Sequence, residues 1–160
     1  MKPESVTVKN IEAAFAGESM AHIKYMYFAK ICRAQGDVET ARVFEDTAAQ
    51  EVQHAFGHLD LLYPPAAMNP ANCLEMAIAG ETYEYTEMYP NFRHLAEQEG
   101  HHAAVAEMDE QIAESKQHAA RFRDTLAKAA RRFAALARVE ERHANRYRAT
   151  LARTREQVNK

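Results

Sequence analysis

The sequence repeats itself across two halves, and this repeat limits the folds that are open to the chain. An Ala-Gly-Glu tripeptide at residues 16–18 recurs at residues 79–81. Each copy is followed by a glycine and, eighteen residues after that glycine, by a histidine, which is His54 in the first half and His118 in the second. The chain is therefore built from two related halves of similar local design.

The two halves differ in a Glu-x-x-His motif. The first half ends with Glu51 and His54, one helical turn apart, whereas the second half has Ser115 where the glutamate is expected. An intact copy of the motif, Glu140 with His143, follows 25 residues after Ser115. The function of the chain is expected to depend on this repeated set of carboxylates and imidazoles.

Apolar residues recur every three or four positions, which predicts long amphipathic helices. Glycine, asparagine and proline positions place two helices over about residues 7–36 and 37–63, a crossover connection at 64–72 and a third helix over about 73–95. Residues 101–156 contain neither glycine nor proline and predict one very long helix or two joined by a weakly marked turn. This is the pattern of an all-α four-helix bundle.

Composition narrows the class of protein. A length of 160 residues, 47% of them apolar, predicts a single domain over residues 1–160, and the net charge of −3 argues against nucleic acid as a partner. No signal peptide or membrane span is indicated, so we expect a cytoplasmic protein. Cys32 and Cys73 cannot form a CxxC pair, which excludes a thiol-rich metal centre.

The repeated acidic and imidazole residues suit a metal site. A glutamate and a histidine three residues apart share one helix face, and single glutamates on an apolar stripe need a cation to offset their burial. One such motif alone is usually a solvated pair, but two copies in matching register argue against coincidence. Oxygen-rich ligands with only two imidazoles favour iron or manganese over zinc. The candidate ligands are Glu18, Glu51, His54, Glu81, Glu84, Glu140 and His143.

The strings around these ligands resemble the rubrerythrin family, in particular its short erythrin-like members without a rubredoxin domain. They are residues 14–19, 27–30, 51–55, 79–90 and 139–143. The resemblance implies a ferritin-like four-helix bundle with two iron ions in a non-haem di-iron centre, for which manganese or zinc could substitute. It further implies reduction of hydrogen peroxide with electrons from an external rubredoxin-like protein or reductase.

The resemblance also implies roles for single residues. Glu51 and Glu140 would bridge the two metals, and one iron would move between His54 in the reduced state and Glu84 in the oxidised state. Two tyrosines would donate hydrogen bonds to ligand carboxylates. By resemblance, the catalytic candidates are Glu84, His54, Tyr25 and Tyr89.

The chain departs from the family in its last third. Residues 118–126 closely match residues 143–151, so about 101–126 is expected to be an inserted or duplicated helical segment. Twenty-five residues of helix correspond to about seven turns and about 37 Å, so one straight helix cannot bring both copies to one site.

Three geometries remain open for the distal motif. A turn near residues 112–115 would form a hairpin and return Glu140 to the level of Glu84. Alternatively, one long helix would carry Glu140 into the bundle of a partner chain, as in a domain-swapped homodimer. In the third geometry, Glu114 and His118 replace the usual pair.

Two other functions fit the same residues. A ferroxidase or iron-handling protein would use the site to oxidise ferrous iron and release it for storage. A metal-binding helical assembly module would use residues 101–156 for oligomerisation, with zinc or no metal.

Overall fold

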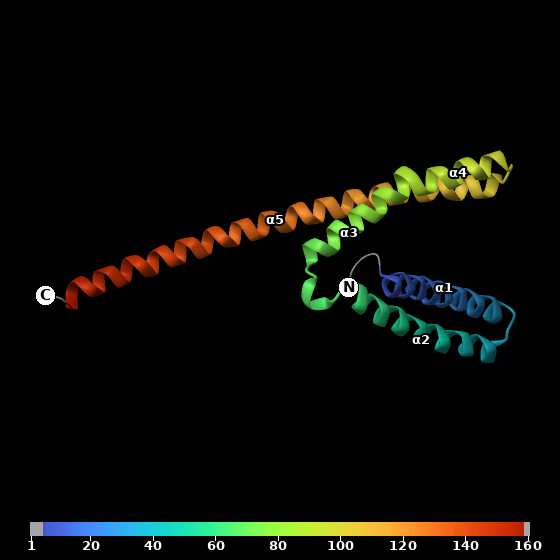
Figure 1. Ribbon diagram of the computed structural model, residues 1–160, viewed down its shortest axis with the longest axis horizontal. Helices are drawn as coiled ribbons and strands as arrows, with labels where there is room; N and C mark the ends of the chain where they lie inside the picture. The colour runs from blue at the N-terminus through green and yellow to red at the C-terminus, as the bar shows by residue number, and fades with distance from the viewer. Residues whose placement is uncertain (1–4, 159–160) are drawn as a thin grey trace. The chain divides into compact units, whose positions relative to one another are not determined.

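The computed structural model describes residues 5–158, and within that range the chain is helical without a strand (Figure 1). The predicted all-α class is thus confirmed. None of the helices within these residues is long and apolar enough to cross a membrane. The chain divides into two compact units, Met1–Met68 and Asn69–Lys160, each built around a helical hairpin.

Unit 1 is a hairpin of α1 (Val6–Ala34) and α2 (Val38–Leu62), followed by the short 3₁₀ helix η1 (Pro65–Ala67). The helix boundaries predicted near residues 36 and 37 are confirmed at the turn. Gly36 has a φ of 85°, which favours glycine, and Asp37 Oδ1 accepts a hydrogen bond of 3.0 Å from the backbone N–H of Thr40. The turn therefore ends α1 and caps α2 within three residues.

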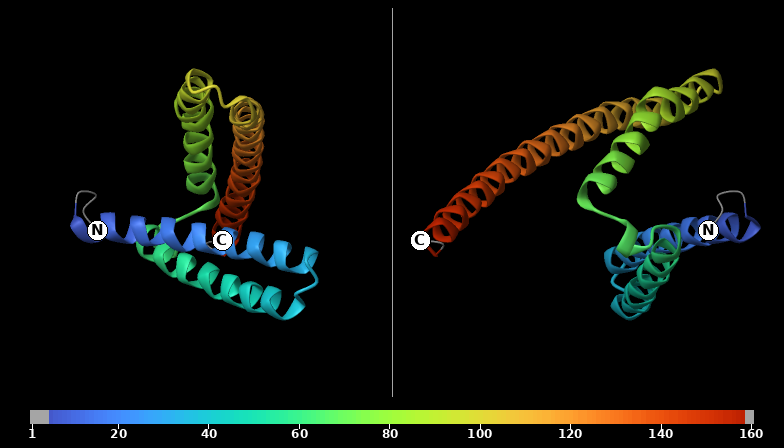
Figure 2. Two further views of the ribbon diagram at one scale, coloured as in Figure 1. Left: turned by 90° about the vertical axis from the view of Figure 1, so that its right-hand side faces the viewer. Right: turned by 60° about the vertical axis from the view of Figure 1, so that its left-hand side comes forward.

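Small residues allow the two helices of unit 1 to approach closely. Ala41, Ala48 and Ala55 follow one another at seven-residue intervals on α2 and are buried. An alanine seam leaves room for the backbone of α1, which lies beside α2 along its length (Figure 2). At the hairpin end, Arg33 forms a two-pronged ion pair with Glu45, with distances of 2.7 and 2.6 Å.

Unit 2 begins with one helical rod made of three segments. These are α3 (Pro70–Tyr83), the π-helical turn η2 (Glu84–Met88) and α4 (Tyr89–Gln98). The predicted N-cap is confirmed, since Asn69 Oδ1 accepts hydrogen bonds from the backbone of the first turn of α3.

The π turn explains how Pro90 is accommodated in this rod. The N–H of Tyr89 bonds to the carbonyl of Glu84, five residues back, instead of to the residue four back. Proline lacks an N–H and its ring crowds the carbonyl four residues earlier, so a widened turn relieves the conflict. This π turn contains the candidate ligand Glu84.

The last helix, α5 (His102–Val158), is continuous. Of the geometries left open for the last third of the chain, the hairpin with a turn near residues 112–115 is therefore wrong, and the single very long helix is found. After Gly100, whose φ is 74°, the chain offers no helix breaker, and Ser115 and Ala119 are buried in the pairing of α5 with α3. A break there would expose a packed face, so the helix runs on past the start of α3 (Figures 1 and 2).

Both units have small cores. The buried apolar residues within the described range are Val8 and five alanines, whereas many large apolar side chains are exposed. Examples are Ile23, Tyr27 and Phe56 in unit 1 and Phe92 and Phe133 in unit 2. Each hairpin consequently presents an apolar face that its own two helices do not cover.

Candidate metal centre

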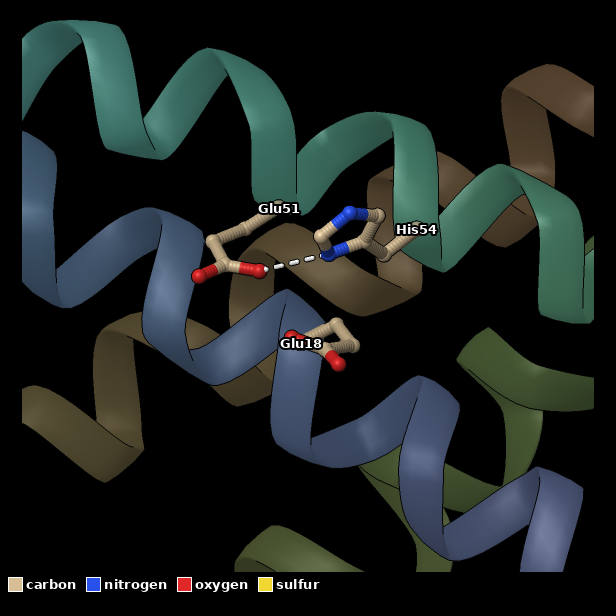
Figure 3. Close-up of side chains that lie close together, drawn as sticks. All are labelled: Glu18, Glu51 and His54. Carbon is tan, nitrogen blue, oxygen red and sulfur yellow. Dashed lines mark hydrogen bonds and ion pairs between the residues drawn. The ribbon is translucent and has the colours of Figure 1, made fainter.

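Three of the predicted ligands meet in unit 1. Glu18 extends from α1, and Glu51 and His54 extend from α2 toward it, with one ligand atom of each lying within 4.8 Å of the others (Figure 3). Glu51 Oε2 and His54 Nδ1 are 3.0 Å apart. The sequence-based grouping of these three residues is thus found in the structure.

The burial of this cluster suits a cation. The Glu51 side chain is only 16% exposed, Glu18 is half-buried, and the His54 ring is 58% exposed. Two carboxylates held this close repel each other unless a positive charge lies between them. Oxygen ligands with one imidazole nitrogen form the kind of donor set that iron accepts.

His22 was given no role by sequence reasoning. Its Nδ1 lies 2.8 Å from the carbonyl oxygen of Ala48, so it joins α1 to α2 one helical turn after Glu18. The spacing of four residues from Glu18 was the available signal. This contact fixes the relative position of the helices that carry the cluster.

Unit 2 contains a second cluster of different composition. His118 Nδ1 lies 3.4 Å from Glu81 Oε1, and the Ser115 hydroxyl donates a 2.8 Å hydrogen bond to Glu84 Oε2. Ser115 is 3% exposed. The residue at the position of the expected glutamate is therefore part of the cluster, but as a hydroxyl donor to a carboxylate.

Of the alternative ligand pair Glu114 and His118, only the histidine lies in the cluster of unit 2. Glu114 is exposed on α5, whereas His118 faces Glu81. The four-residue spacing of Glu114 and His118 suggested that both lie on one face of α5. The residue that joins His118 in the cluster is instead Ser115.

An unsatisfied atom in unit 2 tests whether the site suits a metal. Glu81 Oε2 is buried and has no hydrogen-bond partner among residues 5–158. A buried carboxylate oxygen without a partner is costly, and a bound cation would compensate it. The cluster thus contains donors that suit a metal, but among the described residues only the unit 1 cluster brings three such donors within 4.8 Å of one another.

Glu140 and His143 lie elsewhere on α5. Both are exposed, and the helix is unbroken between Ser115 and Glu140, so about 37 Å of helix axis separates the two motifs at about 1.5 Å per residue. Unit 2 alone does not bring the distal motif to Glu81. Its assignment as a ligand pair stays a prediction.

The two predicted tyrosines lie in different environments. The Tyr25 ring is half-buried beside Phe44, with ring centroids 5.9 Å apart. Burial raises the pKa of the Tyr89 phenol, and the negative charges of Glu84 and Glu81 raise it further. The Tyr89 phenol thus lies near enough to the carboxylates of unit 2 to be affected by their charge, while the hydrogen bonds expected of both tyrosines stay predictions.

The glycines before Glu18 and Glu81 make no close contact with a neighbouring helix in their own unit. A Cβ added at Gly17 or Gly80 would meet no atom within 4 Å. Neither glycine is therefore required for the packing of its hairpin.

Comparison with known proteins gives a consistent family. The family model for rubrerythrin matches residues 9–126. Rubrerythrin of Nitratidesulfovibrio vulgaris is 39% identical over 75% of this chain and 69% of its own length, and rubrerythrin of Porphyromonas gingivalis is 34% identical over 92% and 67%. A solved structure of fully reduced, all-ferrous nigerythrin is 33% identical, covers 81% of this chain and 72% of its own, and has a TM-score of 0.40.

Proposed function

Because the chain belongs to the rubrerythrin family, with its ferritin-like helical fold, we propose that it is a non-haem di-iron oxidoreductase that reduces hydrogen peroxide to water. Proteins of this family bind iron and are oxidoreductases. The observation that carries the proposal is the pair of carboxylate and imidazole clusters, one in each hairpin.

Each unit offers its own proposed ligands. In unit 1, Glu18, Glu51 and His54 would bind iron, and in unit 2, Glu81 and Glu84 would bind iron. His118, which faces Glu81 at 3.4 Å, is the histidine that unit 2 itself offers. The carboxylates supply the negative charge that ferrous and ferric ions need, and the imidazoles supply neutral nitrogen donors.

When bound, two ferrous ions supply two electrons, which with two protons convert one hydrogen peroxide to two water molecules as the oxygen–oxygen bond breaks. The side chains prepare the site for this change. The hydrogen bond between Glu51 and His54 orients the imidazole, and the Ser115 hydroxyl orients Glu84. Tyr89 offers a phenol O–H near these carboxylates.

Turnover requires a source of electrons outside the described fold. The two cysteines, Cys32 and Cys73, are far apart in the sequence and form no CxxC motif. We propose that an external electron-donor protein, rubredoxin-like or a reductase, reduces the centre after each peroxide.

The direct test compares two oxidants. The full chain is loaded with ferrous iron without air, and ferric absorbance is followed after mixing with hydrogen peroxide or with dissolved dioxygen. We expect oxidation by peroxide to be faster by at least about tenfold, an energy difference of about 1.4 kcal/mol in the barrier. Gln53→Ala, exposed on the same helix as His54, serves as the control variant and should behave like the wild type.

The same experiment separates the proposal from its rivals. Faster oxidation by dioxygen, with many equivalents of iron consumed per chain, would indicate a ferroxidase. A folded protein without affinity for iron would indicate an assembly module.

A further inference from the structure

A hollow lies at the corner of unit 2 where α5 runs past the start of α3 (Figure 1). It has a volume of about 650 Å³ and is lined by Pro70 of α3 and by residues of α5 between Thr125 and Leu136. Sites for small molecules are usually about 300–1,000 Å³ in volume. None of the residues of the two metal clusters lines this hollow, so it is a separate feature of the unit.

The wall of this larger hollow is apolar. Phe133 is 68% exposed and Leu136 is 58% exposed, which leaves apolar surface in contact with water. A smaller hollow of about 230 Å³ adjoins the larger one and shares Pro70, Ala129 and Phe133 with it. The one polar residue among those described that line the smaller hollow is Asn69, whose Oδ1 already accepts two backbone N–H groups. Since an apolar cavity of about 150 Å³ can hold benzene, the smaller hollow has room for a ring or part of an alkyl chain.

The rim of the larger hollow is basic. It includes Lys128, Arg131 and Arg132, and residues 125–139 contain four Lys and Arg but no Asp or Glu. Lys128 pairs with Asp124 at 2.5 Å, whereas neither arginine has a carboxylate partner among the side chains that the structure describes. A guanidinium group pairs with a carboxylate through two parallel N–H bonds. The rim therefore complements an anion.

We propose that the two hollows together bind one small amphipathic anion, an alkyl carboxylate. Its chain lies against Ala129 and Phe133. Its carboxylate pairs with Arg131 and Arg132. An inorganic anion would leave the apolar wall uncovered, and a neutral lipid would leave the two arginines without a partner. This site goes beyond the proposed function and does not depend on iron.

A flat anionic membrane surface matches the same helix less well. A basic helix with one apolar side is typical of helices that lie on such surfaces. On α5, however, Glu140 follows Leu136 by four residues and precedes Tyr147 by seven, so an exposed carboxylate interrupts the apolar side. Contact of that side with lipid would bury the charge at a cost in free energy. A single molecule in the hollows avoids this cost, because Glu140 lines neither of them.

Isothermal titration of the full chain with sodium octanoate tests the site directly. We expect saturable binding of one octanoate per chain, and binding of 1-octanol, the neutral analogue, that is weaker by at least about tenfold. No saturable binding of octanoate, or equal affinity for octanol, would overturn the proposal. So would a chain that binds phosphatidylglycerol vesicles but not free octanoate.

The apolar wall is tested by filling it. Ala129→Phe places a ring in the wall that the two hollows share, so octanoate binding should weaken by at least about tenfold. Ala134→Phe is the matched control, because Ala134 is exposed on α5 and lines neither hollow. It should bind octanoate as the wild type does. Equal loss of binding in both variants, each shown to be helical by circular dichroism, would contradict this location.

The basic rim is tested without changing the apolar wall. A chain with both Arg131→Gln and Arg132→Gln should bind octanoate at least about tenfold more weakly, whereas a chain with both Arg138→Gln and Arg142→Gln should bind normally. These exposed positions keep the variants informative even if Ala129→Phe does not fold. Unchanged affinity in the first chain would overturn the pairing with the carboxylate.

Sedimentation of the same samples identifies the competing occupant. If octanoate binding disappears at concentrations where the chain self-associates, a second copy covers the hollows and the proposal is wrong. The heat of binding is measured without reference to iron. A wild type that binds octanoate but no iron would therefore contradict the proposed function and support this site.

Discussion

The two hairpins share a turn design and a register of carboxylate and histidine, but they differ at one position. Unit 1 has Glu51 beside His54, and unit 2 has Ser115 beside Glu84. Unit 1 therefore holds a complete three-residue cluster, whereas unit 2 keeps a buried carboxylate oxygen of Glu81 with no partner in the part of the chain that the structure describes. A scaffold can thus be repeated while its ligands diverge, because helix packing depends on the small seam residues and metal binding on a few others.

Removal of the unit 1 carboxylate should have the largest effect. Glu51→Ala takes away a ligand and the acceptor that orients His54, so we expect iron binding to weaken by more than about 100-fold. Isothermal titration with ferrous iron under nitrogen measures this. Gln53→Ala should bind as the wild type does. If Glu51→Ala bound ferrous iron as tightly as the wild type does, the distinction drawn between the two clusters would be contradicted.

A carboxylate placed at position 115 of unit 2 should give this unit the Glu-x-x-His motif that unit 1 has. We expect Glu140→Ala to lower iron affinity by about 10-fold to 100-fold, and Ser115→Glu in the same chain to recover most of that loss. The reason is that residue 115 lies next to Glu84 and one turn before His118. Iron content after gel filtration is the readout. A double variant no better than Glu140→Ala would mean that Ser115 does not occupy a ligand position.

Substitutions in the turns that the two hairpins share should have a smaller effect, and this effect is on the stability of the fold. Gly36→Ala and Gly100→Ala force a side chain into a positive φ, and each should lower the free energy of unfolding by about 1–2 kcal/mol. Gly57→Ala, within α2 where an added Cβ meets no atom, should instead raise it by up to about 1 kcal/mol. Urea denaturation of the metal-free chains compares the three. A loss at Gly57 as large as at Gly36 would contradict this account.

The smallest effect concerns the ion pair at the end of unit 1. The hydrogen bond from Arg33 lowers the pKa of Glu45, so the pair stabilises the fold above the ordinary pKa of glutamate and loses that contribution as pH falls through the lowered value. Both side chains remain partly exposed to solvent, at 45% for Arg33 and 34% for Glu45, so Glu45→Gln should lower the melting temperature only slightly at neutral pH and not at all in strong acid. A difference that grows toward acid pH would contradict this sign.

Local signals in the sequence were sufficient for most of the fold. Asp37, Asn69, Gly36 and Gly100 stand where helices begin and end, because capping and positive φ depend on nearby atoms. The cluster of Glu18, Glu51 and His54 followed from the register of the repeat. These features depend on contacts within one helix or between two neighbouring helices.

Other features depend on contacts that a pattern does not contain. The absence of a turn at residues 112–115 follows from the burial of Ser115 and Ala119, and the hydrogen bond from Ser115 to Glu84 joins residues 31 apart in the sequence. The π turn at Glu84 follows from how Pro90 fits into a continuous helical rod, which the spacing of apolar residues does not reveal. The place of Glu140 and His143 was beyond sequence reasoning, since it depends on what lies along the distal half of α5.

Metal analysis of the full chain, purified after growth with iron, tests the central claim that the carboxylate and histidine cluster of each unit binds iron. We predict about two iron ions per chain in the wild type, and loss of iron when either Glu51 or Glu81 is changed to alanine. A folded wild-type protein that contains no iron, or that keeps its full iron content after both changes, would contradict it.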